Sequence, residues 1–370
     1  MKSSYRKKKI AILTGRIMGK GGTETVLSTL GNNSELNKIF DFDIFITEHL
    51  SNKDLFDFLN TLKLVRKIKI DKSVNRIWRN ISIVLYLIIT QADIVIGMKP
   101  RYIQIAAKIK KYFNKRYKVV SWIHFSLKHM PGSGNSFEKM QLFLPMADAH
   151  LAISSGIANE LIEIGISSEN ISIIYNPLSR QESTIYPVKQ DGIARFVYVG
   201  RLYDEQKNII GLLNILSTFD INLQLDVFGT GPDEKVIHKV AKQLLDKKSH
   251  VVWHGWSQNP WEQIDNADAL LLTSNYEGFP MTLLESISRG LPVVSYDCPT
   301  GPEDIIKNGE NGYLIPIGSQ EKFKDGMTKV TNHQKFSDRE NVKNTLDFLY
   351  GDAYTERFKS AIHNILGILD

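Results

Sequence analysis

The chain has 370 residues, of which 42% are hydrophobic and 23% charged, so its composition is that of a globular protein long enough for two domains. Its one cysteine, Cys298, excludes an internal disulfide and favours a reducing compartment. Residues 1–179 hold 26 Lys and Arg against 14 Asp and Glu, whereas residues 180–370 hold 20 against 26. The basic first half and the acidic second half are therefore expected to meet different partners.

No stretch of the chain predicts a transmembrane segment. The apolar residues 10–13 are too few for a signal peptide and fit a first β-strand. The longest apolar run, residues 81–90, is shorter than the roughly 20 residues that span a bilayer. We therefore expect a cytoplasmic protein.

The first half reads as alternating strands and helices. Strands are predicted at residues 9–15, 42–47, 93–98, 117–124 and 149–154, with helices such as 24–30 and 102–113 between them. The second half repeats the pattern, with strands predicted at 194–202, 223–231, 250–256, 268–274 and 292–297. β-branched runs separated by helices indicate parallel sheets in an α/β fold.

A segment rich in Pro, Ser and Gly, residues 175–192, separates the halves. We predict an N-terminal domain over 1–178, a second domain over 179–350 and a final helix over 351–370. Both domains would be Rossmann-like and doubly wound, and would face one another across a cleft. In such sheets ligands bind at the carboxyl ends of strands, so those positions carry the candidate site.

Two carboxylates follow the strand predicted at 268–274. Glu277 lies in the turn after it, and Glu285 lies within the next helix, for which Pro280 suits the first position and Gly290 the end. A helix rises about 1.5 Å per residue, so the two acids do not converge on one atom as a glycosidase pair does. They fit two contacts on an elongated ligand better, although a helix with charged ends remains an alternative. The backbone N–H groups of Phe279, Met281 and Thr282 would offer an anion site between them.

Two other strand ends add to this site. Arg201 and Lys207 follow the first strand of the second domain and can reach a diphosphate on that anion site. Gly229 and Gly231 follow the next strand and permit close approach of the backbone. A nucleotide sugar is a ligand of this kind, because it is elongated and carries its negative charge in the middle. The alternative interpretation is that Arg201 and Lys207 are solvated charges in a loop.

The stretch Glu277-Gly278-Phe279-Pro280 with Glu285 resembles the E-x7-E motif of retaining glycosyltransferases of family 4, which have the GT-B fold. The resemblance covers nearly the whole chain and is strongest to bacterial lipopolysaccharide 1,6-galactosyltransferases. It also includes the glycine-rich GGTE loop with Gly21, Gly22 and Glu24, the segment SWIHFSLKH with His124, and the segments HLAISSGI, YNP and GPEDIIKNGENG.

The resemblance implies a role for each of these residues. Arg201 and Lys207 would bind the donor diphosphate, Glu277 the donor sugar and Glu285 the ribose hydroxyls. His124 would reach the donor sugar from the other domain, and the GGTE loop would approach the donor phosphate and the acceptor. The final helix would cross back to the N-terminal domain. Pro280 departs from the pattern because many relatives have glycine there, and proline removes one N–H of the anion site.

The implied activity is a metal-independent hexosyl transfer from a UDP-sugar, with UDP-galactose as the favoured donor, to a glycan or lipid-linked glycan such as lipopolysaccharide core. No cofactor and no nucleic acid are expected. UDP-glucose or UDP-N-acetylhexosamine as donor, capsule, exopolysaccharide or teichoic-type acceptors, a nucleotide-sugar epimerase and a non-catalytic glycan-binding protein remain alternatives. Asp41 and Asp43 match a metal-binding DxD, but they open a strand instead of following one. The G-x-G-x-x-G of a dinucleotide site is incomplete because Glu24 replaces its last glycine.

A basic segment lies in the first half. Residues 108–118, KIKKYFNKRYK, read as the end of an amphipathic helix whose apolar stripe includes Ile103, Ala106 and Ile109. A solvated outer face is one interpretation. The other is peripheral docking on the anionic inner face of the plasma membrane, since each Lys or Arg near such a surface contributes about 1 kcal/mol.

Overall fold

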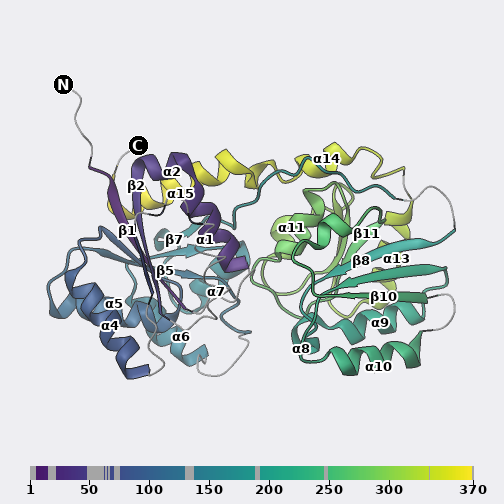
Figure 1. The fold of residues 1–370 in the computed structure, drawn as a ribbon, viewed down its shortest axis with the longest axis horizontal. Helices are drawn as coiled ribbons and strands as arrows, with labels where there is room; N and C mark the ends of the chain where they lie inside the picture. The colour runs from purple at the N-terminus through teal and green to yellow at the C-terminus, as the bar shows by residue number, and fades with distance from the viewer. Residues whose placement is uncertain are drawn as a thin grey trace. The chain divides into compact units, whose positions relative to one another are not determined.

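The computed structural model describes residues 6–15, 22–47, 62, 65, 67–70, 76–129, 137–187, 192–245, 249–332 and 334–368. The chain forms two compact units, which are Met1–Pro177 with Asp352–Asp370, and Leu178–Gly351 (Figure 1). The boundaries expected from the sequence lay after residues 178 and 350. Each unit contains one parallel sheet, so the predicted α/β class with two Rossmann-like domains is confirmed.

The N-terminal sheet has, in the described part of the chain, the strand order β3-β2-β1-β4-β5-β6-β7. Its elements are β1 (Lys8–Thr14), α1 (Gly22–Asn32), α2 (Ser34–Ile39), β2 (Phe40–Ile46), β3 (Lys67–Ile70), α4 (Arg76–Ile89), β4 (Ile94–Gly97), α5 (Pro100–Tyr112), β5 (Lys118–Ile123), α6 (Phe137–Phe143), η1 (Leu144–Met146), β6 (Ala149–Ala152), α7 (Ser155–Glu163), η2 (Ser168–Asn170), β7 (Ile171–Ile173) and α15 (Gly351–Leu366).

The two faces of the N-terminal sheet bury different residues of β2. Side chains alternate along a strand, so Phe40 and Phe42 point to one face and Phe45 to the other. On the first face Phe358 of α15 packs with its ring centroid 6.3 Å from Phe40 and 6.2 Å from Phe42. On the second, the Tyr86 ring of α4 lies 4.8 Å from Phe45. The C-terminal helix thus completes the core of the N-terminal unit.

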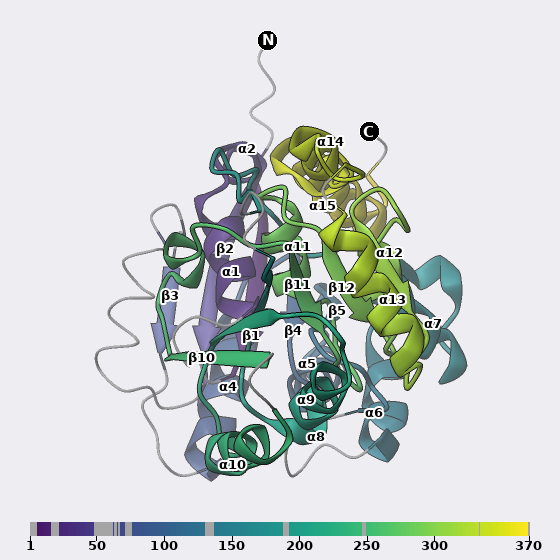
Figure 2. The ribbon, with the colours of Figure 1, turned by 90° about the vertical axis from the view of Figure 1, so that its right-hand side faces the viewer.

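The second sheet has, among the described residues, the order β10-β9-β8-β11-β12-β13. Its unit contains β8 (Ala194–Val199), α8 (Asp204–Lys207), α9 (Ile209–Ser217), β9 (Leu223–Phe228), α10 (Glu234–Leu244), β10 (Ser249–Gly255), η3 (Pro260–Gln263), β11 (Ala269–Leu272), α11 (Met281–Ile287), β12 (Val293–Tyr296), α12 (Pro302–Ile305), β13 (Gly312–Ile315), α13 (Gln320–Thr331), α14 (Arg339–Asn344) and η4 (Asp347–Leu349). Helices α9 and α10 pack side by side in both views (Figures 1 and 2).

Three of the strands in the described part of the chain were not predicted. They are β3, β7 and β13, which all stand at sheet edges and have 4, 3 and 4 residues. A short edge strand is paired on one side only, so it carries a weak sequence pattern.

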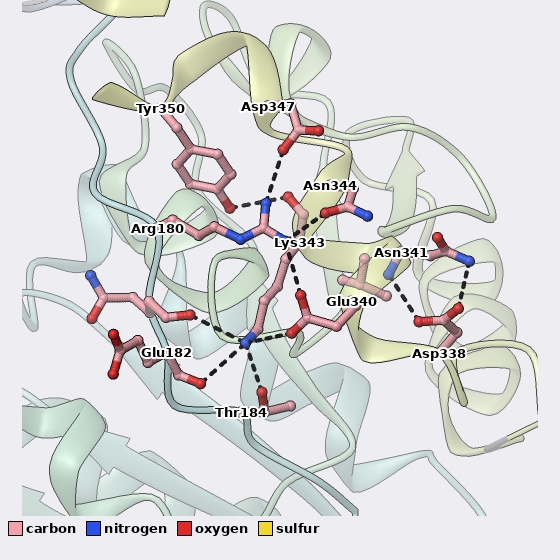
Figure 3. A network of polar contacts seen from close by, with 12 residues as sticks. Arg180, Glu182, Thr184, Asp338, Glu340, Asn341, Lys343, Asn344, Asp347 and Tyr350 are labelled. Atoms are coloured by element: carbon pink, nitrogen blue, oxygen red, sulfur yellow. Dashed lines mark hydrogen bonds and ion pairs between the residues drawn. The ribbon is translucent and has the colours of Figure 1, made fainter. Parts of the chain in front are cut away.

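The chain enters and leaves the C-terminal unit at one place, because Leu178 and Tyr350 form a parallel bridge. The following segment is held on α14 by a polar network (Figure 3). The buried Lys343 ammonium donates to Thr184 Oγ1 at 2.7 Å and lies 3.0 Å from Glu340. Arg180 forms ion pairs with Glu340 at 2.9 Å and Asp347 at 3.0 Å. This network fixes both chain crossings to the C-terminal unit.

Within the described ranges, no helix is both long and apolar enough to cross a membrane. Residues 81–89 of the longest apolar run belong to α4, which buries Ile83, Tyr86 and Leu87 on the side that faces the sheet.

Candidate functional site

The candidate site lies at the carboxyl ends of β8, β9 and β11, which are neighbours in the C-terminal sheet. The loops after β8 and β11 contact each other directly. Asn275 N–H donates to the Gln206 carbonyl at 2.7 Å, and Thr273 Oγ1 donates to the Asn208 carbonyl at 3.0 Å. These contacts bring Lys207 and Glu277, 70 positions apart in the sequence, to one edge of the sheet.

Glu277 and Lys207 form an ion pair with Nζ 2.6 Å from Oε1, and their side chains are 8% and 16% exposed. Ser274 Oγ donates to the same oxygen at 2.6 Å. Both bonds use Oε1 of the carboxylate. The buried charge is compensated by the ammonium, as a carboxylate in low dielectric requires.

The backbone around Glu277 is held by the loop after β12. Glu277 N–H donates to the Pro299 carbonyl at 3.2 Å, and the Thr300 hydroxyl donates to the Glu277 carbonyl. Gly301 has φ +103°, and a Cβ there would lie 2.7 Å from Pro280 Cδ. A larger residue at 301 would therefore displace the turn that carries Glu277.

The helix after this turn differs from the prediction at both ends. Pro280 is the N-cap, not the first helical residue, and α11 begins at Met281. It ends at Ile287, three residues before the predicted end at Gly290, which has φ +71°. Proline has no N–H to offer, so the first-turn amides are those of Met281 and Thr282.

Glu285 has a partner that the sequence reasoning missed. The Trp261 indole Nε1–H donates to Glu285 Oε2 at 2.8 Å, and the Arg289 guanidinium lies 5.1 Å from the centre of the Trp261 ring. Burial raises the pKa of Glu285, while the Trp261 hydrogen bond and the Arg289 charge lower it to a smaller extent. Trp261 follows β10 in the run NPWEQ, where only its position in a loop at a strand end could have drawn attention.

Arg201 and the two glycines follow β8 and β9. The exposed Arg201 guanidinium lies 5.9 Å from the centre of the Tyr203 ring, so it is not part of the Glu277 ion pair. Gly229 has φ +147°, and a Cβ there would lie 1.8 Å from the Gly200 carbonyl oxygen. A Cβ on Gly231 would lie 2.1 Å from the Leu202 carbonyl oxygen. Both glycines thus let the loops after β8 and β9 pack together, in addition to any ligand contact.

His124 lies in the N-terminal unit, directly after β5. Its ring centroid is 4.9 Å from that of Trp122, and burial lowers its pKa to about 3. Among the described residues, neither ring nitrogen has a hydrogen-bond partner. A buried imidazole without hydrogen-bond partners costs free energy.

The glycine-rich loop is described only in part. Gly21 lies outside the described residues, whereas Gly22 begins α1 and Glu24 is buried in its first turn. Asp41 and Asp43 lie within β2. In the described portion of the chain, no three His, Cys, Asp or Glu side chains gather in a way that could hold a metal ion.

Two protein families match the chain in tandem. The family described as "Glycosyltransferase Family 4" matches residues 21–182, and "Glycosyl transferases group 1" matches residues 182–345. The lipopolysaccharide 1,6-galactosyltransferase of Salmonella typhimurium is 33% identical over 97% of this chain and 99% of its own length. That of Escherichia coli is 37% identical over 74% of this chain and 75% of its own length.

Solved structures give the same result. The apo lipopolysaccharide outer core galactosyltransferase WaaB superposes with a TM-score of 0.80 at 33% identity, covering 96% of this chain and 99% of that one. Anabaena HepE in complex with UDP and glucose has a TM-score of 0.76 at 14% identity, over 96% of this chain and 99% of that one.

Two Rossmann-like units with carboxylates and cations at the strand ends of the second define a GT-B glycosyltransferase. The chain belongs to the family 4 glycosyltransferases of this fold, so the resemblance predicted from the sequence is confirmed.

Proposed function

We propose that this enzyme transfers galactose from UDP-galactose to a lipopolysaccharide core acceptor, with retention of the anomeric configuration. The observation that carries the proposal is the similarity to the Salmonella 1,6-galactosyltransferase, which extends over 97% of this chain at 33% identity. The transfer needs no cofactor, because the UDP-sugar is itself the substrate.

The donor diphosphate is proposed to bind Arg201, Lys207 and the first turn of α11. Departure of UDP places negative charge on its distal phosphate. The two cations stabilise that charge without a metal ion, and the backbone amides of Met281 and Thr282 add hydrogen bonds. Glu285, held by Trp261, would accept hydrogen bonds from the ribose hydroxyls.

Glu277 is proposed to hold the hydroxyls of the donor sugar. Lys207 and Ser274 fix its Oε1, so that the carboxylate is oriented before the donor arrives. The acceptor hydroxyl would attack from the face on which UDP departs, and the leaving phosphate would take its proton. On this mechanism no side chain has to act as a strong general base.

The N-terminal unit is proposed to supply acceptor contacts, and His124 a contact to the donor sugar. With its pKa lowered to about 3, the imidazole is neutral at pH 7, so it can donate one hydrogen bond and accept another. The loop with Gly21, Gly22 and Glu24 would approach the donor phosphate and the acceptor.

A donor screen tests the proposal. Purified enzyme is incubated with UDP-galactose, UDP-glucose and UDP-N-acetylhexosamines, without acceptor and then with lipopolysaccharide truncated before the outer-core galactose. We expect slow UDP release from UDP-galactose and faster release with that acceptor. Preference for another donor would reassign the sugar, and acceleration only by a capsule, exopolysaccharide or teichoic-type polymer would reassign the acceptor. No turnover with any donor would favour a glycan-binding protein.

We also propose that the enzyme works at the inner face of the plasma membrane, docked through the basic residues of α5. Lys108, Lys111 and Arg116 are exposed, whereas Lys110 is paired with Asp148 at 2.7 Å. A variant with the three exposed residues changed to serine keeps that internal ion pair. It should lose binding to anionic vesicles at low salt, while the wild type should bind them and not neutral vesicles.

A further inference from the structure

The outer face of α4 exposes a continuous apolar stripe. Trp78, Ile81, Leu85 and Ile89 are 62%, 39%, 55% and 70% exposed. Their spacing of three, four and four residues places them on one side of a helix with 3.6 residues per turn. An apolar stripe on a surface helix indicates a face that meets something other than water.

The opposite face of the same helix is already occupied. Ile83, Tyr86 and Leu87 are buried, and Tyr86 packs on Phe45 of the sheet. Helix α4 therefore cannot turn its exposed stripe into the core without giving up these contacts.

A basic rim lies beside this stripe. Helices α4 and α5 pack together, and their carboxyl ends meet where Lys115 Nζ donates to the Thr90 carbonyl at 3.5 Å. Both helices carry Lys or Arg but no Asp or Glu. The residues exposed at the end of α5 and just after it are Lys108, Lys111, Tyr112, Phe113, Asn114, Arg116 and Lys118. Figure 1 shows the two helices together on one side of the N-terminal sheet.

We propose that the outer face of α4 inserts into the boundary between headgroups and acyl chains of an anionic bilayer, with the basic rim of α5 on the lipid phosphates. Trp78 and Tyr112 would sit at headgroup depth, which suits amphipathic aromatic rings. The charge argues against a second copy of this chain as the occupant, because pairing two such faces would bring two basic rims together. The inference rests on the proposed membrane docking and adds an apolar, salt-resistant anchor to it.

The experiment compares the wild type with Trp78→Ser/Leu85→Ser, in vesicles of phosphatidylcholine with and without phosphatidylglycerol. Binding is measured by sedimentation at low salt and at about 1 M salt, where the screening length is only about 3 Å. The control variant, Val236→Ser/Ile162→Ser, removes two side chains that are 55% and 46% exposed elsewhere on the surface. A second readout is quenching of tryptophan fluorescence by brominated acyl chains, assigned with Trp78→Phe.

We expect the wild type and the control to remain partly bound at high salt, and the α4 variant to bind anionic vesicles at least about tenfold more weakly. Quenching should vanish in Trp78→Phe. Binding that high salt abolishes, with the α4 variant equal to the wild type, would overturn the insertion and leave electrostatic docking intact. No binding to any vesicle would overturn both the insertion and the docking, and a dimer that the α4 substitutions dissociate would overturn the insertion. Transfer to a detergent-solubilised acceptor should be the same in all variants, which separates this outcome from failure of the proposed activity.

Discussion

Replacing Glu277 by glutamine, alone and together with Lys207→Met, separates the folding role of this ion pair from its role in transfer. The two side chains lie 2.6 Å apart with 8% and 16% of their surface exposed. Glu277→Gln keeps the shape of the side chain and can still accept the Ser274 hydrogen bond, but it leaves the Lys207 ammonium without its counter-charge.

Leaving one buried charge uncompensated costs about 3–5 kcal/mol. For a domain of the size of the C-terminal unit, each kcal/mol lowers the unfolding midpoint by about 2–4 °C, so a fall of roughly 6–20 °C is expected in each single variant. The double variant has no buried charge at this position and should recover most of that loss. Its activity should not recover, because a charge-assisted hydrogen bond to the donor sugar, worth about 1.5–3 kcal/mol, is still missing. A reduction of kcat by about tenfold to hundredfold follows.

The assay combines thermal unfolding with steady-state release of UDP below the midpoint of the weakest variant. The matched control is Asp325→Asn, which breaks an ion pair of the same length, 2.6 Å to Lys329, in which the two side chains are 59% and 51% exposed. An exposed pair contributes little, so this control should stay within about 0.5 kcal/mol of the wild type and be fully active. A double variant with wild-type kcat, or single variants as stable as the control, would refute the reasoning.

Three further predictions follow from single contacts. Glu285→Gln should remove a loss of stability that the wild type shows as the pH rises through and above about 4.5. Burial raises the pKa of Glu285, so the folded state binds the proton more tightly than the unfolded state, and ionisation disfavours the folded state. Chemical denaturation between pH 4 and 7 would contradict this if the stabilities of the two proteins changed in parallel. Lys343→Met should destabilise the C-terminal unit by about 1–3 kcal/mol, because the Thr184 hydroxyl and the Gln181 and Glu182 carbonyls lose their buried donor; a midpoint unchanged in urea would count against the network in Figure 3. Gly229→Ala should prevent the loops after β8 and β9 from closing, because its Cβ would lie 1.8 Å from a carbonyl oxygen, and normal donor binding by calorimetry would disprove that.

Much of the fold could be predicted from the sequence because it is encoded locally. Apolar runs such as residues 268–274 and 292–297 contain β11 and β12, and the helices between them forced parallel pairing. The position of Glu277 after a strand and of Glu285 in the next helix needed only the spacing of apolar, Gly and Pro residues. The edge strands β3, β7 and β13 were not predicted, because a short strand with one neighbour has only a weak pattern of apolar residues.

The partners of the site residues were decided by tertiary structure alone. Lys207 meets Glu277 only because β8 and β11 are adjacent in the sheet, and Trp261 reaches Glu285 across 24 positions of sequence. The need for glycine at position 229 likewise depends on tertiary structure, because the Gly200 carbonyl that a Cβ would contact belongs to the loop after β8. The apolar run of α4 was visible in the sequence, but which of its side chains face water depends on where the sheet lies. Residue types and periodicity are properties of the chain itself, whereas these contacts depend on strand order and on how each helix is turned against its sheet.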